Sequence, residues 1–197
     1  MRRSLLAFLA VFALAGFVLL PTIAEANGLE IGTTVENFSL PDTEGKMQTL
    51  DSLRGKNGTV VVWLSAQCPV VKAYKDRINE IAAAYKAKGI NFVGINSNST
   101  EDLAWITSNM AEFGYQFPML IDKGNVLADK WGATVTPEVF YLDSKNVLLY
   151  HGAIDNDRSG KNVQEPFLKT AFDASLSGKT IEKTKTAAFG CTIKRAE

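Results

Sequence analysis

The stretch TVVVWLS, Thr59 to Ser65, constrains the fold of this chain more than any other part. Its residues are nearly all apolar and β-branched, which is typical of a strand buried on both faces in the middle of a sheet. After Cys68, apolar side chains recur at the spacing of one helix face, at Val71, Tyr74, Ile78, Ile81 and Tyr85. A buried strand that runs straight into an amphipathic helix predicts an α/β domain.

Strands and helices continue to alternate after this helix. Residues 38–50 predict two short strands around a Pro-Asp…Gly turn. Residues 90–97 and 117–122 predict two further strands. Between them, the residues from Ser99 to Asp102 cap a helix that ends at Gly114. The predicted core face of this helix consists of Leu103, Ile106, Met110 and Phe113.

The last part of the chain predicts a short helix, a hairpin and a final helix. Residues 126–131 form the short helix, and the segments EVFYLD and VLLYHG form the hairpin around SKN. Pro166 opens the final helix, where its missing N–H costs nothing, and Gly178 closes it. The whole order predicts a mixed central sheet flanked by helices. The predicted core face of the final helix consists of Phe167, Leu168, Ala171, Phe172 and Leu176.

The first 26 residues predict a secretory signal peptide. Arg2 and Arg3 precede an apolar run over residues 5–20, and the AEA of residues 24–26 is a small-x-small cleavage site. An uncleaved membrane anchor is the alternative, but the run is shorter than the about 20 residues that a bilayer requires. We therefore expect an exported protein, periplasmic or secreted, with one mature domain over residues 27–197 and no stable membrane association after cleavage.

The charge balance excludes some classes of partner. Without Arg2, Arg3 and Glu25, 19 basic and 20 acidic side chains remain of the 21 of each kind. Such a balance argues against nucleic acid or an anionic membrane surface as a partner. Export also matters for Cys68 and Cys191, the two cysteines of the chain, because a disulfide persists outside the reducing cytosol.

Four segments carry a family resemblance. The segments VVVWLSAQCP, VTPEVFYLD, HGAID and GCTIK resemble those of thioredoxin-like redoxins. Within these, the chain is most similar to the peroxiredoxin-like branch, related to alkyl hydroperoxide reductase and thiol-specific antioxidant proteins, over about residues 33–194. The resemblance implies a thioredoxin-like fold with an N-terminal β-hairpin and a C-terminal tail, redox activity that includes weak thiol peroxidase activity, and no bound cofactor.

Around Cys68, the chain also departs from the families that it resembles. Val71 stands where thioredoxin has the second cysteine of Cys-x-x-Cys, and Val62 where it has a buried acid. Val61 replaces the proline of the peroxiredoxin motif, although Ser65 could serve as its Thr/Ser. No arginine lies between positions 77 and 158 to complete the peroxiredoxin triad. These departures weaken the case for efficient peroxide reduction.

Cys68 is the candidate nucleophile. It is expected at the N-cap of the helix that Pro69 begins, where unpaired N–H groups and partial positive charge stabilise a thiolate. Lys72, one turn later, could add to this effect or be a solvated surface lysine. The alternative for Cys68 is a buried structural thiol. Gln67 and Pro69, which flank the cysteine, are candidate substrate contacts.

Thr136 is the third candidate substrate contact, and Pro137 is a candidate catalytic residue together with the two cysteines. The resemblance implies that Pro137 has a cis peptide bond and packs against the cysteine. A cis bond turns the carbonyl and N–H before it outward, where an extended substrate chain can pair with them. The alternative is an ordinary trans proline ahead of an edge strand.

Cys191 lies 123 residues after Cys68, in a polar tail over residues 179–197 with few apolar residues to anchor it. A flexible tail could bring it to Cys68 as a resolving cysteine, the second thiol that opens a mixed disulfide. The alternatives are a static Cys68–Cys191 disulfide and a free or intermolecular Cys191. Phe189 could anchor a turn at Gly190, with Ile193 in the face near Pro137.

Two other features carry little chemistry. His151 is the single histidine of the chain, and one histidine cannot build a metal site. The loop over residues 155–165 begins like a calcium loop, but Pro166 stands where the glutamate at its twelfth position is required. We expect a solvated acidic loop there, and no metal.

The sequence predicts two alternative functions, which belong to different classes. The first is an exported thiol–disulfide oxidoreductase with Cys68 as nucleophile and Cys191 as resolver. It acts on a thiol or disulfide protein or on a small-molecule thiol, and it needs an external reductant that the sequence does not identify. The second is a non-enzymatic redoxin-fold binding module that a structural Cys68–Cys191 disulfide stabilises.

Overall fold

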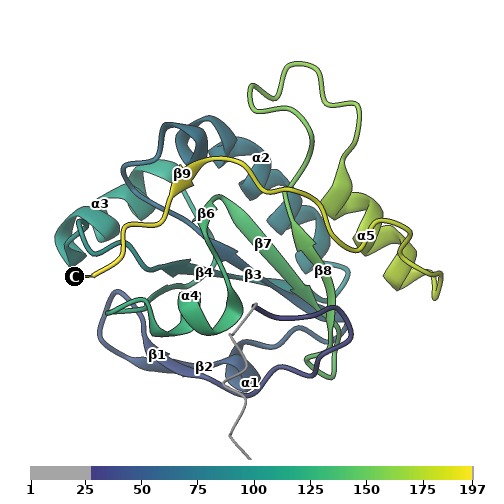
Figure 1. The fold of residues 1–197 in the computed structure, drawn as a ribbon, viewed down its shortest axis with the longest axis horizontal. Coiled ribbons are helices and arrows are strands. Elements are labelled where there is room, and N and C mark those ends of the chain that lie inside the picture. The colour runs from purple at the N-terminus through teal and green to yellow at the C-terminus, as the bar shows by residue number, and fades with distance from the viewer. Residues whose placement is uncertain (1–27, 197) are drawn as a thin grey trace, which may run out of the picture.

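The central sheet has five strands in the order β5-β4-β3-β7-β8 (Figure 1). Strand β3 (Gly58–Trp63) runs parallel to β4 (Ile90–Asn96), which runs parallel to β5 (Met119–Ile121). On the other side, β7 (Glu138–Leu142) is antiparallel to β3, and β8 (Leu148–Gly152) is antiparallel to β7. All six residues of β3 are buried, which confirms that it is the central strand.

The computed structural model describes residues 28–196. The predicted signal peptide over residues 1–26 therefore lies outside the described residues. Within residues 28–196, no helix is both long and apolar enough to cross a membrane.

Helices cover both faces of the sheet. The alternation of β3 sends Val60 and Val62 to one face and Val61 and Trp63 to the other. The first face packs under α2 (Pro69–Lys86), α3 (Leu103–Phe113) and α5 (Phe167–Leu176), and the second under α1 (Leu50–Leu53) and α4 (Val126–Trp131). Figure 1 shows the two groups on opposite sides of the sheet. The structure thus confirms the predicted thioredoxin-like α/β fold.

The predicted N-terminal hairpin is present as β1 (Ser39–Pro41) and β2 (Met47–Thr49), which pair antiparallel. Helix α1, which the sequence analysis did not predict, follows β2 at once. Thr49 caps it through a reciprocal pair of hydrogen bonds with Ser52. A helix of one turn is too short to show a hydrophobic period.

The predicted core face of α3 is wrong at its first residue. Leu103 is 49% exposed, whereas α3 buries Ile106, Asn109 and Phe113, and Met110 is half-buried. Asn109 faces inward because its side-chain amide donates to the carbonyl of Ala66. Hydrophobic spacing alone did not reveal this polar contact.

The C-terminal tail is better anchored than expected. Its backbone bonds to the edge of β8, where Thr186 N–H donates to the carbonyl of His151. Further on, β9 (Cys191–Thr192) pairs antiparallel with β6 (Val135–Thr136), and Ile193 is buried. The expectation of a weakly anchored tail is wrong, because backbone hydrogen bonds hold the tail in addition to its apolar side chains. Figure 1 shows the tail in yellow as it crosses the domain from α5 to the start of α2.

Candidate redox site

Cys68 sits where the central strand passes into α2. Strand β3 ends at Trp63, a short loop follows, and Cys68 is the N-cap of the helix that begins at Pro69. The carbonyl of Cys68 accepts the first helical hydrogen bond, from Lys72 N–H at 3.0 Å. The predicted N-cap position of the cysteine is confirmed. The thiol therefore lies beside the unpaired N–H groups of the first helical turn.

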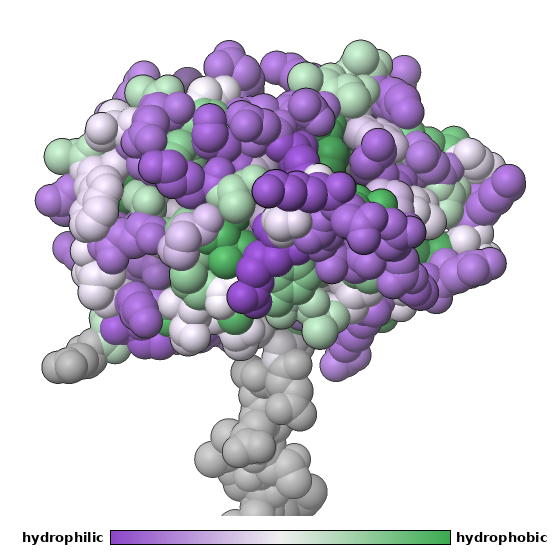
Figure 2. All heavy atoms as spheres, turned by 90° about the horizontal axis from the view of Figure 1, so that it is seen from above, coloured by the Kyte–Doolittle hydropathy of each residue, from purple (hydrophilic) through white to green (hydrophobic). Residues whose placement is uncertain are grey.

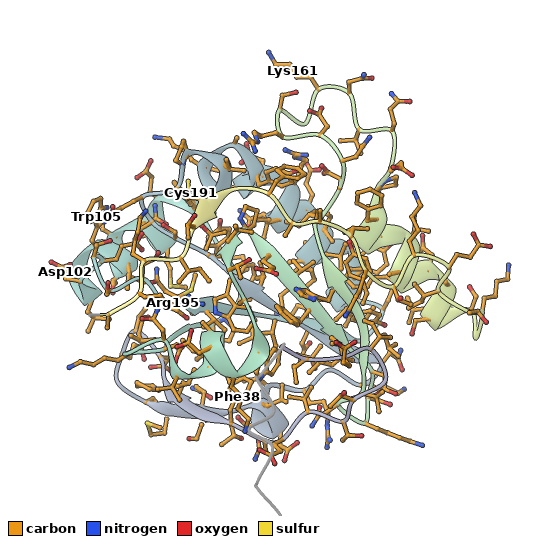
Figure 3. All side chains as sticks on the ribbon, viewed as in Figure 1. Phe38, Asp102, Trp105, Lys161, Cys191 and Arg195 are labelled. Atoms are coloured by element: carbon orange, nitrogen blue, oxygen red, sulfur yellow. The ribbon has the colours of Figure 1, made fainter. Side chains whose placement is uncertain are left out.

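Cys191 faces Cys68. The two sulfur atoms lie 2.8 Å apart, and both cysteines are free thiols in this structure. Cys68 is buried and Cys191 is half-buried. Figure 3 shows Cys191 on the tail, beside the start of α2, with Arg195 further along the same segment. The structure thus brings together two cysteines that are 123 residues apart in the sequence.

The Thr136–Pro137 peptide bond is cis, as expected. The Thr136 carbonyl oxygen lies 3.2 Å from Cys68 Sγ. Thr136 is also the partner of Cys191 in the β6–β9 ladder, and its hydroxyl donates to the Cys191 carbonyl at 3.4 Å. The backbone edge that was expected to bind a substrate chain is therefore paired with the tail of the same molecule.

The two thiols have opposite pKa shifts. Burial raises the pKa of Cys68, but hydrogen bonds from the Cys191 thiol, from Val71 N–H and from Thr136 outweigh it, so the pKa of Cys68 lies below its ordinary value. Burial, and then the neighbouring Cys68 sulfur, raise the pKa of Cys191 to about 11. The same hydrogen bond lowers one pKa and raises the other, because a protonated Cys191 donates to the Cys68 thiolate.

The loop before Cys68 rests on a buried carboxylate, that of Glu101. This carboxylate accepts hydrogen bonds from the Ser65 hydroxyl, from Ala66 and Gln67 N–H, and from the side-chain amide of Asn96. From the sequence, Glu101 was predicted only as part of a helix cap. Its position just after the neighbouring parallel strand was the available signal, because the carboxyl ends of parallel strands meet at one sheet edge.

The side chains of the candidate supporting residues, Ser65 and Lys72, and of the candidate substrate contact Gln67 interact with groups other than the Cys68 sulfur. The Ser65 hydroxyl donates to Glu101, and the Gln67 amide donates to the Thr100 carbonyl. Lys72 is exposed and lies 3.7 Å from a carboxylate oxygen of Glu112. Of the two roles considered for Lys72, its position matches the solvated surface lysine. Pro69 is exposed beside the thiol pair.

The acidic loop after β8 is exposed, as expected, except near its start, where Asp155 is buried. Asp155 accepts hydrogen bonds from the Tyr74 hydroxyl and from Arg77, each at 2.6 Å. Asp157 caps the backbone of its own loop through Ser159 and Asn162. The expectation of a solvated loop is wrong at Asp155, because Arg77 on α2 supplies a cation for the buried carboxylate. The contacts of Asp155 with Tyr74 and Arg77 were not predicted from the sequence.

His151 has a structural partner. Its Nε2 atom lies 2.6 Å from Glu138, whose other carboxylate oxygen accepts the N–H groups of Thr134 and Val135. The pair therefore supports the segment that leads into β6 and the cis proline.

A facing thiol pair, one member of which caps the helix after the central strand of a thioredoxin-like sheet, defines a redox-protein architecture. Residues 30–166 match the Redoxin family, and the chain belongs to that family. Among curated relatives, the thiol-disulfide oxidoreductase ResA of Bacillus anthracis is 29% identical over 120 residues, which cover 61% of this chain and 68% of that protein. ResA of Halalkalibacterium halodurans is 27% identical over 165 residues, which cover 84% and 88%.

Two solved structures share the fold over nearly all of their length. A hypothetical protein from Sinorhizobium meliloti is 33% identical with a TM-score of 0.79, and the match covers 86% of this chain and 97% of that one. An uncharacterized conserved protein from Geobacillus kaustophilus is 28% identical with a TM-score of 0.80, and the match covers 86% and 94%.

Proposed function

We propose that this protein is a thiol–disulfide oxidoreductase in which Cys68 is the nucleophile and Cys191 the resolving cysteine. The observation that carries the proposal is the 2.8 Å separation of the two sulfurs. Their opposite pKa shifts support it, because one thiol is prepared to attack while the other holds its proton. The curated relatives that carry the name thiol-disulfide oxidoreductase support the same reaction class.

The first step is attack by the Cys68 thiolate on a partner disulfide. A new bond forms between Cys68 Sγ and one partner sulfur, the partner S–S bond breaks, and the other partner sulfur leaves as a thiolate. Loss of the negative charge on Cys68 also removes one cause of the raised pKa of Cys191. Cys191 therefore becomes easier to ionise only after the mixed disulfide has formed.

The second step is attack by the Cys191 thiolate on Cys68 Sγ. The Cys68–Cys191 disulfide forms, and the second partner sulfur leaves as a thiolate, so that two electrons have passed to the partner. An external dithiol reduces the Cys68–Cys191 bond and completes the cycle. In this proposal the chain needs no bound cofactor, and Thr136, Pro137, Gln67 and Pro69 contact the substrate.

The proposal places the protein outside the cytosol, in the periplasm or secreted, as one mature domain over residues 27–197. The predicted signal sequence and the use of both cysteines in disulfide chemistry support this location. Peroxide reduction in the manner of the peroxiredoxin-like branch is the lesser activity. The Ser65 hydroxyl is held by Glu101 and Arg77 by Asp155, so neither side chain is directed at the sulfur.

The reduction potential of the cysteine pair tests the proposal. Residues 27–197 are oxidised, the bond is assigned by mass spectrometry, and the protein is equilibrated with dithiol buffers of known potential. We expect a Cys68–Cys191 bond with a potential above about −300 mV, because structural disulfides typically lie below that value. A lower potential, or an oxidised Cys68 with Cys191 still free, would favour the non-enzymatic binding module or a different resolving thiol.

A further inference from the structure

The nucleophile of the proposed reaction is covered by the tail of its own chain. Cys68 is 2% exposed, and its sulfur touches the Cys191 sulfur on one side and the Thr136 carbonyl on another. Disulfide exchange requires an incoming sulfur to reach the attacking thiolate. While β9 is in place, Cys191 occupies that approach.

The cover is attached firmly on its C-terminal side. Ile193 is buried among the side chains that pack around Trp63 and Trp131, and its N–H donates to the Thr134 carbonyl. Lys194 donates its N–H to Asn98, and its carbonyl accepts the N–H of Ser99. These contacts fix the position of β9 on its C-terminal side.

The N-terminal side of the cover is attached by side chains. The Phe189 ring packs against Tyr74 at 6.2 Å between centroids, and Arg158 lies over the same ring at 5.3 Å. Between Phe189 and Ile193, the backbone is held by the β6–β9 ladder, which has only two residue pairs. A ladder this short opens at small cost, in the way that terminal segments fray.

Gly190 lets the cover lie close to β6. A side-chain carbon at this position would overlap the Thr136 carbonyl oxygen. The backbone of Gly190 is not in the left-handed region, so the glycine is required here for close approach and not for its conformation. A larger residue at position 190 must therefore push β9 away from β6. Such a substitution does not alter either thiol chemically.

We propose that β9 is a removable cover that occupies the partner-binding edge of β6, and that a partner disulfide reaches Cys68 only when β9 lifts from this edge. The partner that fits is an extended protein segment with a cysteine, whose backbone pairs with Thr136 in place of Cys191. This inference rests on the proposed function. Return of β9 then performs two tasks at once, since it delivers Cys191 to the mixed disulfide and displaces the product segment from β6.

The surface favours recognition through backbone pairing. Figure 2 shows hydrophilic and hydrophobic residues interspersed on the face seen from above, without a broad apolar patch on it. The edge of β6 instead offers backbone hydrogen bonds, which bind an extended chain with little regard to its side chains.

The test compares full-length chains that all carry Cys191→Ser, so that Cys68 is the single thiol. Two of them also carry a change that displaces the cover, Gly190→Ala or Ile193→Asp, because an aspartate cannot stay buried without a partner. The matched control carries Ala187→Ser, at an exposed tail residue. The probe is a short unstructured peptide whose cysteine is activated as a thionitrobenzoate disulfide, and the coloured leaving group reports attack by Cys68.

We expect both displacing changes to speed the reaction by about tenfold or more at equal thiolate fraction, because reactivity follows the open population. The control should react like the Cys191→Ser parent. Hydrogen exchange over residues 189–194 checks that β9 has lifted, and circular dichroism checks that the domain is folded. Equal peptide rates in all four chains would overturn the cover and leave the oxidoreductase intact. Faster alkylation by iodoacetamide without any attack on the peptide would support the cover and count against the oxidoreductase.

Discussion

At the scale of single residues, the site depends on two side chains of the same kind that behave differently. Cys68 caps a helix N-terminus and receives hydrogen bonds from Cys191, Val71 and Thr136, so its thiolate is stabilised despite burial. Cys191 is partly buried and has that thiolate for a neighbour, so both burial and the thiolate raise its pKa and stabilise its thiol. This difference in pKa supports the proposed order of the two chemical steps, in which Cys68 attacks first and Cys191 second.

The pH dependence of Cys68 reactivity follows from its lowered pKa. Below that pKa the thiol is protonated and the rate of alkylation falls with pH, whereas above it the rate is constant. We expect the midpoint to lie below the about 8.5 of a free cysteine. Cys191→Ala removes the donor that lowers the Cys68 pKa most, so the midpoint should move to higher pH. Rate profiles with iodoacetamide measure both midpoints, and a midpoint that stays in place would show that Cys191 does not stabilise the thiolate.

Glu101 should contribute to stability through its four hydrogen bonds. Glu101→Gln keeps the shape of the side chain but replaces one acceptor oxygen with a donor that faces N–H groups. We expect a loss of about 1–3 kcal/mol in the free energy of unfolding, the cost of leaving buried donors unpaired. Glu112→Gln, at an exposed position on α3, should change it by less than about 0.5 kcal/mol. Urea titrations of the two variants provide the comparison.

At the scale of elements, the site is a junction between α2 and the two-stranded pair β6–β9. Helix α2 fixes the position of the nucleophile, because Cys68 is the N-cap of this helix. Strand β9 fixes the position of the resolving thiol. Its two residues, Cys191 and Thr192, pair with β6, and the next residue, Ile193, is buried. The efficiency of disulfide formation therefore depends on how well β9 is seated.

Ile193→Ala should make the Cys68–Cys191 bond harder to form. The substitution removes apolar contacts that seat β9, so Cys191 spends less time beside Cys68. We expect the equilibrium constant for forming the Cys68–Cys191 bond, measured against glutathione, to fall by at least about tenfold. A core truncation of this kind costs more than the about 1.4 kcal/mol that a factor of ten represents. Ile181→Ala, at a half-buried tail position, is the control. An equal change in both variants would indicate a general loosening of the tail.

At the scale of the whole molecule, the tail connects distant parts of the domain. It leaves α5, follows the edge of β8, crosses β6 and passes α4, where Arg195 pairs with Asp129 at 2.8 Å. Closing the Cys68–Cys191 bond would tie this path to the start of α2. The bond would span 123 residues of sequence, so it would restrict the unfolded chain strongly.

Oxidation should therefore stabilise the domain. Loop-closure entropy for a bond of this span amounts to about 4–5 kcal/mol in the free energy of unfolding. Urea titrations of the oxidised and reduced protein measure the difference. Cys191→Ala, treated with the same oxidant, should show no such gain. A similar gain in that variant would assign the effect to another oxidised residue.

The sequence by itself determined the parts of this protein that depend on neighbouring residues. The apolar run of β3, the amphipathic period of α2 and the N-cap position of Cys68 are local features, because propensity and capping act over one or two turns. The cis Thr136–Pro137 bond was expected from the family resemblance. Phe189, Gly190 and Ile193 were expected to position the tail near Pro137, but three roles for Cys191 remained open.

Only the tertiary structure decided which distant groups meet. Glu101 reaches the loop before Cys68, Asp155 reaches Tyr74 and Arg77, and β9 reaches β6, over separations that no periodic pattern records. The tail was the hardest part to predict, because it is held largely by backbone N–H and C=O groups, which nearly every residue carries alike. Such pairing leaves almost no mark on the sequence. Gly190 is the exception, because its missing side chain is what allows β9 to lie against the Thr136 carbonyl.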